Sequence, residues 1–236
     1  MKESVFRFKQ FQVKNVASAM KVSTDAVMLG AWVNLSDAHT VWDVGAGTGV
    51  LALMAAQKSD AKISAIEIDD DAAREAEMNF EASRWAGRLQ LVHSDITECY
   101  GMLPQPDVII SNPPYFSTKQ QSIVSENISK GMARHEASLS YDTLLRIASE
   151  VLLPAGRLCM ISPADRRDDI EWSAAVYKLA LRRLTMVRSM EEKPVNRILW
   201  EFGREAMKVE EDELCIRLSN GEYTEKFKNL TKEYYL

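Results

Sequence analysis

The sequence has few metal ligands and no long apolar segment. Its 236 residues include three cysteines and three histidines, and none of these shows the short spacing of a structural zinc site. The cysteines are odd in number and far apart, which argues for a reducing compartment. No apolar run approaches the roughly 20 residues that cross a bilayer, and the amino terminus alternates charged and aromatic side chains. These absences favour a cytoplasmic protein that does not associate with membranes.

The chain also lacks net positive charge, since its formal charge is −5. It therefore has no global attraction to nucleic acid. Two segments run against this balance: residues 1–21 carry five basic side chains and one acid, and residues 178–204 carry seven basic side chains and three acids. Together they could form one phosphate-binding face. Ordinary solvated surface charge explains them equally well.

No repeat, low-complexity tract or flexible linker interrupts the sequence. Short β-branched runs alternate with longer helical patterns, which predicts an α/β fold with a mostly parallel sheet covered on both faces. A helix is predicted from Asp69 to Trp85, and another begins at Pro163. We expect one domain over residues 20–236, preceded by a basic extension at 1–19. The predicted strands are 41–45, 62–68, 89–93, 106–111, 156–162, 182–188 and 196–202.

A glycine-rich turn follows the first of these strands. Gly45, Gly47 and Gly49 lie between an apolar strand and a helical pattern. Glycines let a ligand approach the backbone, and the start of the helix offers unpaired N–H groups. Glu67, twenty residues beyond Gly47 and near the end of the next predicted strand, lies where an acid meets ribose hydroxyls in nucleotide-binding folds. The sequence thus predicts a nucleotide-type cofactor site.

The spacing of the glycines disfavours a dinucleotide, because the third glycine of that fingerprint would fall at Val50. The turn, preceded by Asp43, resembles the first motif of the S-adenosylmethionine-dependent methyltransferases. This resemblance implies a Rossmann-like class I fold with a seven-stranded, mostly parallel sheet. It also implies that Glu67 holds the cofactor ribose, Asp95 contacts its adenine and Asp43 helps to place its methionine end. The product would be S-adenosylhomocysteine, and no metal is required.

The tetrad Asn112-Pro113-Pro114-Tyr115 supplies the acceptor side of the predicted site. The amino nitrogen of a nucleobase is a poor nucleophile because its lone pair is delocalised into the ring. The Asn112 amide oxygen and the Pro113 carbonyl are two suitable acceptors for its N–H bonds, and the proline pair restricts the backbone. Tyr115 would stack on the base. Asn112, Pro113 and Tyr115 are therefore the predicted catalytic residues, and Asn112 also borders the cofactor.

Further motifs narrow the resemblance: residues 8–11, 20–32, the glycine motif, residues 109–115 and residues 230–236 resemble the bacterial tRNA(Val) adenine-N6 methyltransferases. Membership would imply methylation of the adenosine 3′ of the anticodon, with tRNA as partner. It would also bring Lys21 or Thr24 to the methionine end of the cofactor. Independently of function, Ser23 or Thr24 is predicted to cap the following helix.

Alternative functions stay open at this point. A glutamine-N5 methyltransferase of release factors shares the tetrad but carries a longer region before the glycine motif, and a DNA adenine methyltransferase usually has a recognition domain. A dinucleotide oxidoreductase or a non-catalytic nucleotide-binding module would use the turn alone. The polar stretch 116–138 is predicted to contact substrate, with Arg134 and His135 as candidate contacts, and a plain flexible loop is the alternative. We expect a monomer without an obligate protein partner.

Overall fold

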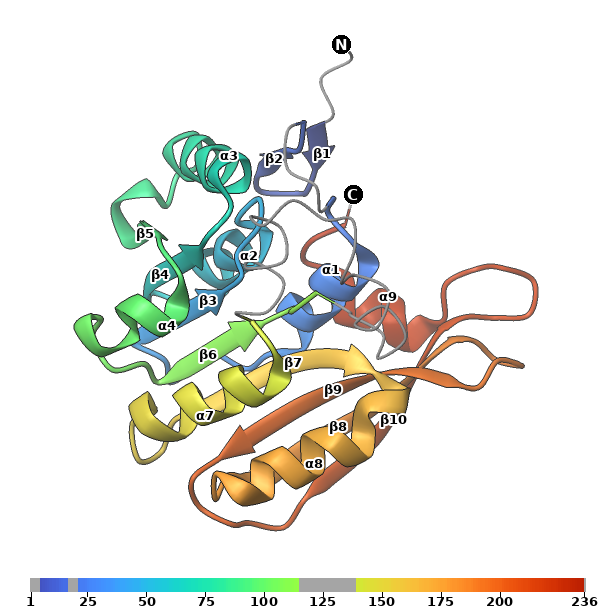
Figure 1. The fold of residues 1–236 in the computed structure, drawn as a ribbon. Helices are drawn as coiled ribbons and strands as arrows, with labels where there is room; N and C mark the ends of the chain where they lie inside the picture. The colour runs from blue at the N-terminus through green and yellow to red at the C-terminus, as the bar shows by residue number, and fades with distance from the viewer. Residues whose placement is uncertain (1–4, 17–20, 115–138, 236) are drawn as a thin grey trace, which may run out of the picture.

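In the computed structural model, which describes residues 5–16, 21–114 and 139–235, one mixed sheet forms the centre of the chain (Figure 1). Its strand order is β10-β8-β9-β7-β6-β3-β4-β5. Only β9 runs antiparallel to its neighbours, so the predicted α/β class with a mostly parallel sheet is confirmed. The strands are β3 (Thr40–Val44), β4 (Lys62–Glu67), β5 (Leu89–His93), β6 (Val108–Ser111), β7 (Arg157–Pro163), β8 (Ala180–Met190), β9 (Val195–Gly203) and β10 (Glu210–Arg217).

The predicted count of seven strands is wrong, because β10 adds an eighth at the edge of the sheet. Its sequence, EEDELCIR, begins with four acidic residues, and these side chains are exposed. An edge strand needs only one paired neighbour, so it tolerates a charged sequence that lacks the usual alternation. The pairing of β10 with β8 is parallel over Arg183 to Met190.

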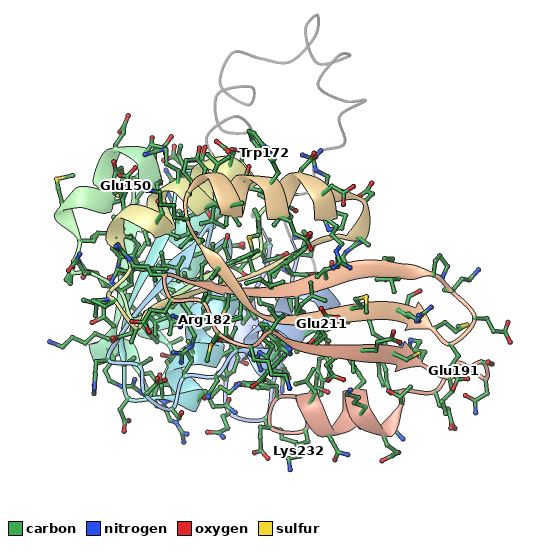
Figure 2. The ribbon with its side chains drawn as sticks, turned by 90° about the horizontal axis from the view of Figure 1, so that it is seen from below. Glu150, Trp172, Arg182, Glu191, Glu211 and Lys232 are labelled. Carbon is green, nitrogen blue, oxygen red and sulfur yellow. The ribbon has the colours of Figure 1, made fainter. Side chains whose placement is uncertain are left out.

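Helices cover both faces of the sheet because side chains alternate along each strand. On β7, for example, Cys159 and Ile161 join the core beneath α1, α2, α3 and α9, whereas Leu158 and Met160 join the core beneath α4, α7 and α8. Figure 2 shows α8 and α9 on opposite sides of the strands that lead to Glu191. The helices are α1 (Thr24–Trp32), α2 (Val50–Lys58), α3 (Asp70–Glu81), α4 (Ile96–Cys99), α7 (Tyr141–Val151), α8 (Arg167–Val176) and α9 (Glu225–Thr231).

The predicted helix 69–85 is confirmed as α3 but ends four residues earlier, at Glu81. Asp69 caps its first turn by accepting the Ala72 N–H at 2.9 Å. Ala72, Ala73, Ala76 and Phe80 are buried as the helical spacing predicted. None of the helices in the described ranges is long and apolar enough to span a membrane.

A two-stranded antiparallel hairpin of β1 (Val5–Arg7) and β2 (Gln12–Lys14) lies outside the main sheet and packs on α3. Two buried polar residues of α3 hold it there. Asn79 Oδ1 accepts the Lys14 N–H at 2.8 Å, and its Nδ2 donates both to the Lys14 carbonyl and to the Thr48 carbonyl in the glycine turn. Glu75 accepts the Val16 N–H at 2.5 Å. The hairpin is thus fastened both to α3 and, through Asn79, to the glycine turn.

The described parts of the two basic segments belong to different elements of the fold. The hairpin lies beside α3, whereas residues 178–204 form β8 and β9 towards the other edge of the sheet (Figure 1). Carboxylates also pair with three arginines of the second segment, in the ion pairs Arg183–Glu201, Arg188–Glu213 and Arg197–Asp25. Among the described residues, the cations of the hairpin therefore lie apart from those of β8 and β9, and a joint phosphate-binding face of the two whole segments stays a prediction.

Candidate functional site

Asp43, the glycine turn and Asn112, three of the features singled out from sequence, lie at the carboxyl edge of the sheet, where β3 and β6 end side by side. Ser111, the last residue of β6, is fully buried and its hydroxyl donates to the Val44 carbonyl of β3 at 2.8 Å. Asn112 and Pro113 follow directly, so this bond fixes their position against the start of the glycine turn. Ser111 was not singled out from the sequence, where only its place before Asn112 could have indicated such a role.

The glycine turn has a backbone conformation that requires its glycines. Gly45, Gly47 and Gly49 have φ angles of 72°, 56° and 80°, in the left-handed region that L side chains rarely adopt. The N–H groups of Gly45 and Ala46 both donate to the Ile66 carbonyl at the end of β4, at 2.9 and 3.1 Å. The turn is thereby held against the neighbouring strand before α2 begins.

Glu67 continues this attachment from β4. Its Oε2 accepts the Gly47 N–H at 2.7 Å, while Oε1 accepts the N–H groups of Ile68 at 2.9 Å and Asp69 at 2.8 Å. Its side chain is buried, whereas an isolated strand end would favour exposure. A carboxylate offers about four lone-pair positions, so three accepted bonds leave room for roughly one ribose hydroxyl.

Asp43 presents an unpaired acceptor beside the turn. It lies on β3, is fully buried, and its Oδ2 accepts the Ala52 N–H of α2 at 2.9 Å. Its Oδ1 is buried and has no hydrogen-bond partner. Burial is the main cause that raises the pKa of the Asp43 carboxyl, and the Glu67 charge adds to it. The bond from the Ala52 N–H lowers the pKa, and the net value is about 7. A buried, unpaired carboxylate oxygen is costly unless a ligand satisfies it, and a ligand ammonium group fits this position.

The other predicted cofactor residues make local hydrogen bonds. Asp95 follows β5 and caps α4, with Oδ1 accepting the Thr97 N–H at 2.8 Å. Ser23 caps α1 by accepting the Ala26 N–H at 3.1 Å, so the predicted capping is confirmed, and Thr24 is the exposed first residue of the helix. Lys21 is exposed and its Nζ donates to the Asn15 carbonyl at 2.8 Å. Their contacts with a cofactor stay predictions.

Three predicted contacts lie outside the described residues, namely Tyr115, Arg134 and His135, together with the rest of the 116–138 stretch. Within the described ranges, no three histidine, cysteine, aspartate or glutamate side chains are grouped as a metal site would require. The arrangement that the structure does describe combines a glycine turn open to a ligand, two buried carboxylates and an amide at a strand end.

The residues present fit S-adenosylmethionine. The unpaired Asp43 Oδ1 suits its methionine ammonium group, Glu67 retains acceptor capacity for its ribose, and a Cβ built on Gly47 meets nothing within 4 Å. The space around a Cβ atom differs between Gly47 and Gly49. A Cβ on Gly49 would lie 2.4 Å from Cε1 of Phe80, so Gly49 allows α2 and α3 to pack together.

Alanine at these two glycines is expected to have different effects. Gly49→Ala combines a left-handed backbone with overpacking against Phe80, so the free energy of unfolding falls by about 2–4 kcal/mol. Gly47→Ala carries the backbone strain alone, about 1–2 kcal/mol, but places a methyl group in the cofactor space. Urea unfolding and calorimetric titration with S-adenosylmethionine measure the two effects. Equal losses of stability in both variants would contradict the packing role of Gly49.

Comparisons with known proteins show the family of the chain. A sequence model of the methyltransferase small domain family matches residues 11–166. The chain is 40% identical to the tRNA1(Val) (adenine(37)-N6)-methyltransferase of Shewanella halifaxensis, over 98% of both chains. It is 39% identical to the protein of the same name from Bacteroides thetaiotaomicron, over 100% of this chain and 99% of the relative.

Solved structures support the fold. A predicted O-methyltransferase from Agrobacterium tumefaciens superposes with a TM-score of 0.69 at 20% identity, covering 89% of this chain and 96% of the other. A methyltransferase from Pyrococcus furiosus gives a TM-score of 0.62 at 19% identity, covering 82% and 89%. These similarities show the class I methyltransferase fold. With the full-length relatives, they lead to one conclusion: the chain belongs to the methyltransferase small domain family and, within it, to the tRNA1(Val) (adenine(37)-N6)-methyltransferases.

Proposed function

We propose that the protein transfers a methyl group from S-adenosylmethionine to the N6 amino group of adenosine 37, 3′ of the anticodon, in tRNA1(Val). The observation that carries this proposal is the position of Asn112-Pro113 at the end of β6, tied by Ser111 to the strand that leads into the glycine turn. The names of the full-length relatives supply the substrate. Because these relatives align with almost the whole chain, we assign the same substrate to this protein.

In the proposed mechanism, bound S-adenosylmethionine supplies an electrophilic methyl group on a sulfonium sulfur. Asp43 and Glu67 orient the two ends of the cofactor through the ammonium and ribose groups. The Asn112 oxygen and the Pro113 carbonyl accept hydrogen bonds from the two N–H groups of the adenine amino group. These bonds free the nitrogen lone pair for in-line attack on the methyl group. Formation of the N6–methyl bond would break the methyl–sulfur bond and leave S-adenosylhomocysteine, and one amino proton would pass from the alkylated nitrogen to water. Tyr115 would stack on the extruded base.

Labelled methyl transfer to unmodified tRNA tests this function. Transcripts of tRNA1(Val) with adenosine or guanosine at position 37 are incubated with the protein and labelled S-adenosylmethionine, and nucleosides are then separated. We expect N6-methyladenosine from the first transcript and no label in the second. Equal labelling of both transcripts would refute the choice of adenosine 37, and label on a protein glutamine instead of RNA would refute the RNA substrate.

A further inference from the structure

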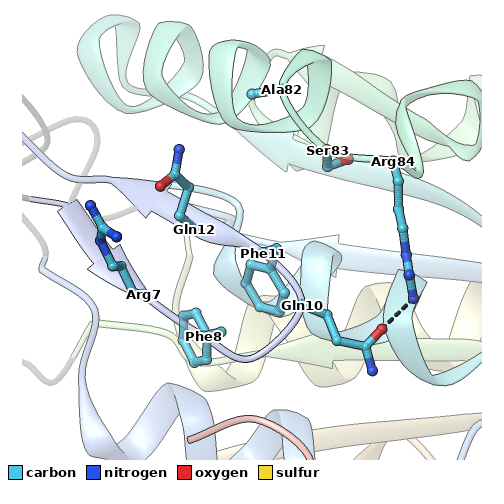
Figure 3. A pocket seen from close by; sticks show the side chains of 8 residues that line it. All are labelled: Arg7, Phe8, Gln10, Phe11, Gln12, Ala82, Ser83 and Arg84. Atoms are coloured by element: carbon cyan, nitrogen blue, oxygen red, sulfur yellow. Dashed lines mark hydrogen bonds between the residues drawn. The ribbon is translucent and has the colours of Figure 1, made fainter. Parts of the chain in front are cut away.

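A pocket of about 400 Å³ lies between the β1–β2 hairpin and the segment that follows α3 (Figure 3). It lies at the end of α3 opposite Glu67, next to the part of the helix whose Asn79 bonds to the Thr48 carbonyl and whose Phe80 packs against Gly49. The side chains that give the pocket its chemistry are Arg7, Gln10, Phe11, Gln12 and Arg84.

The two strands of the hairpin carry Arg7 and Lys14 and no acidic residue. None of the ion pairs among the described residues includes Arg7, Lys9, Lys14 or Arg84. On β8 and β9, by contrast, several arginines are paired with acids. Because the whole chain is acidic, binding of a polyanion depends on local regions of unbalanced positive charge. The hairpin is such a region.

One aromatic ring and one guanidinium group of the pocket are held in place. Phe11 stacks on the buried Phe8, with ring centroids 4.4 Å apart and planes at 18°, and meets Trp85 edge-on at 5.9 Å. The Arg84 guanidinium lies 4.8 Å from the centre of the Trp85 ring and donates to Gln10 Oε1 (Figure 3). A fixed ring and a fixed guanidinium lose little side-chain entropy when a ligand binds.

We propose that this pocket binds a nucleotide of the tRNA other than the methylated adenosine. Arg7 and Arg84 contact its phosphates, the partly exposed Phe11 lies against its base, and the amides of Gln10 and Gln12 bond to base edges or ribose hydroxyls. Single-stranded or looped RNA is recognised by this combination of stacking, amide and guanidinium contacts. The inference rests on the proposed function, because it assumes that the polyanionic substrate is tRNA.

Charge reversal tests the pocket. Binding of unmodified tRNA1(Val) transcript is measured without cofactor over a series of salt concentrations, for the wild type, Arg7→Glu/Arg84→Glu and Lys208→Glu. Lys208 is an exposed residue between β9 and β10 that is distant from the pocket, so its reversal controls for a change in net charge half as large as that of the double variant. We expect the double variant to bind about 10–100-fold more weakly, with a salt slope lower by about two. The Lys208 variant should keep wild-type affinity to within about twofold.

Kinetics and folding complete the test. The double variant should show a higher KM for tRNA with an unchanged kcat and an unchanged Kd for S-adenosylmethionine. Arg7→Gln/Arg84→Gln provides the measurement if charge reversal disturbs folding, as judged by thermal unfolding. If the wild type methylates tRNA but both arginine variants bind it as Lys208→Glu does, the pocket proposal is overturned while the proposed function stands. If the wild type methylates no tRNA, the proposed function itself fails.

Discussion

Replacing Asn112 with alanine is expected to lower kcat for tRNA methylation by about 10²–10³-fold, the loss typical of removing one preorganised polar contact to a transition state. The Asn112 oxygen is one of the two acceptors proposed to hold the reacting amino group. Alanine leaves one N–H group of the adenine without a hydrogen-bond acceptor. Asn112→Asp retains an acceptor oxygen, so we expect a smaller loss. Single-turnover rates with saturating tRNA and cofactor separate this effect from binding.

Asn220 offers a matched control for that variant. It is an exposed asparagine in the turn after β10, where its Oδ1 accepts the Glu222 N–H at 3.0 Å. Asn220→Ala should leave turnover unchanged. Wild-type turnover in the Asn112 variant would remove the catalytic assignment of Asn112, whereas equal losses in both variants would indicate a general effect on folding.

Asp43→Asn is expected to weaken S-adenosylmethionine binding by about 10–100-fold, because a hydrogen bond to a charged group contributes about 1.5–3 kcal/mol. At the same time it should stabilise the protein without cofactor at pH 8. Folding raises the pKa of Asp43 from 3.8 to about 7 through burial. The folded state therefore binds this proton more tightly than the unfolded state. The contribution of Asp43 to stability is full below pH 3.8 and is lost as the pH rises through about 7.

Thermal unfolding at two pH values and with two ligand states measures both parts of that prediction. Asparagine does not titrate. Without cofactor, the free energy of unfolding of the variant should therefore rise relative to that of the wild type between pH 5 and pH 8, by about 1–3 kcal/mol at pH 8. Added S-adenosylmethionine should stabilise the wild type and have little effect on the variant. Equal stabilisation of both proteins by the cofactor would contradict the assignment of Asp43 to the ammonium group.

Local sequence predicts the cofactor turn well. The glycines at 45, 47 and 49 each adopt a positive φ, and α2 starts directly after the last of them. Asp69 caps α3, and the alanines predicted to share one face are buried. These features depend on contacts between residues that are close in the chain, where backbone sterics and helical period suffice. The carboxyl ends of parallel strands then bring Asn112 beside the turn.

Features that depend on distant partners were not predictable from sequence. The β1–β2 hairpin is held by two polar side chains of α3, which are more than 50 residues further along the chain. The edge strand β10 pairs with β8 despite its acidic sequence. Glu67 is buried because it bonds to the Gly47 N–H across the turn. In each case a tertiary contact overrides the local preference.

Asn79 gives the hairpin and the glycine turn a common hydrogen-bonding partner, because its Nδ2 donates to both the Lys14 and the Thr48 carbonyls. A movement of one segment therefore alters the bond to the other. By thermodynamic linkage, any factor by which RNA on the hairpin changes the affinity for cofactor equals the factor by which cofactor changes the affinity for RNA. The Asn79 amide is one structural element that contacts both segments.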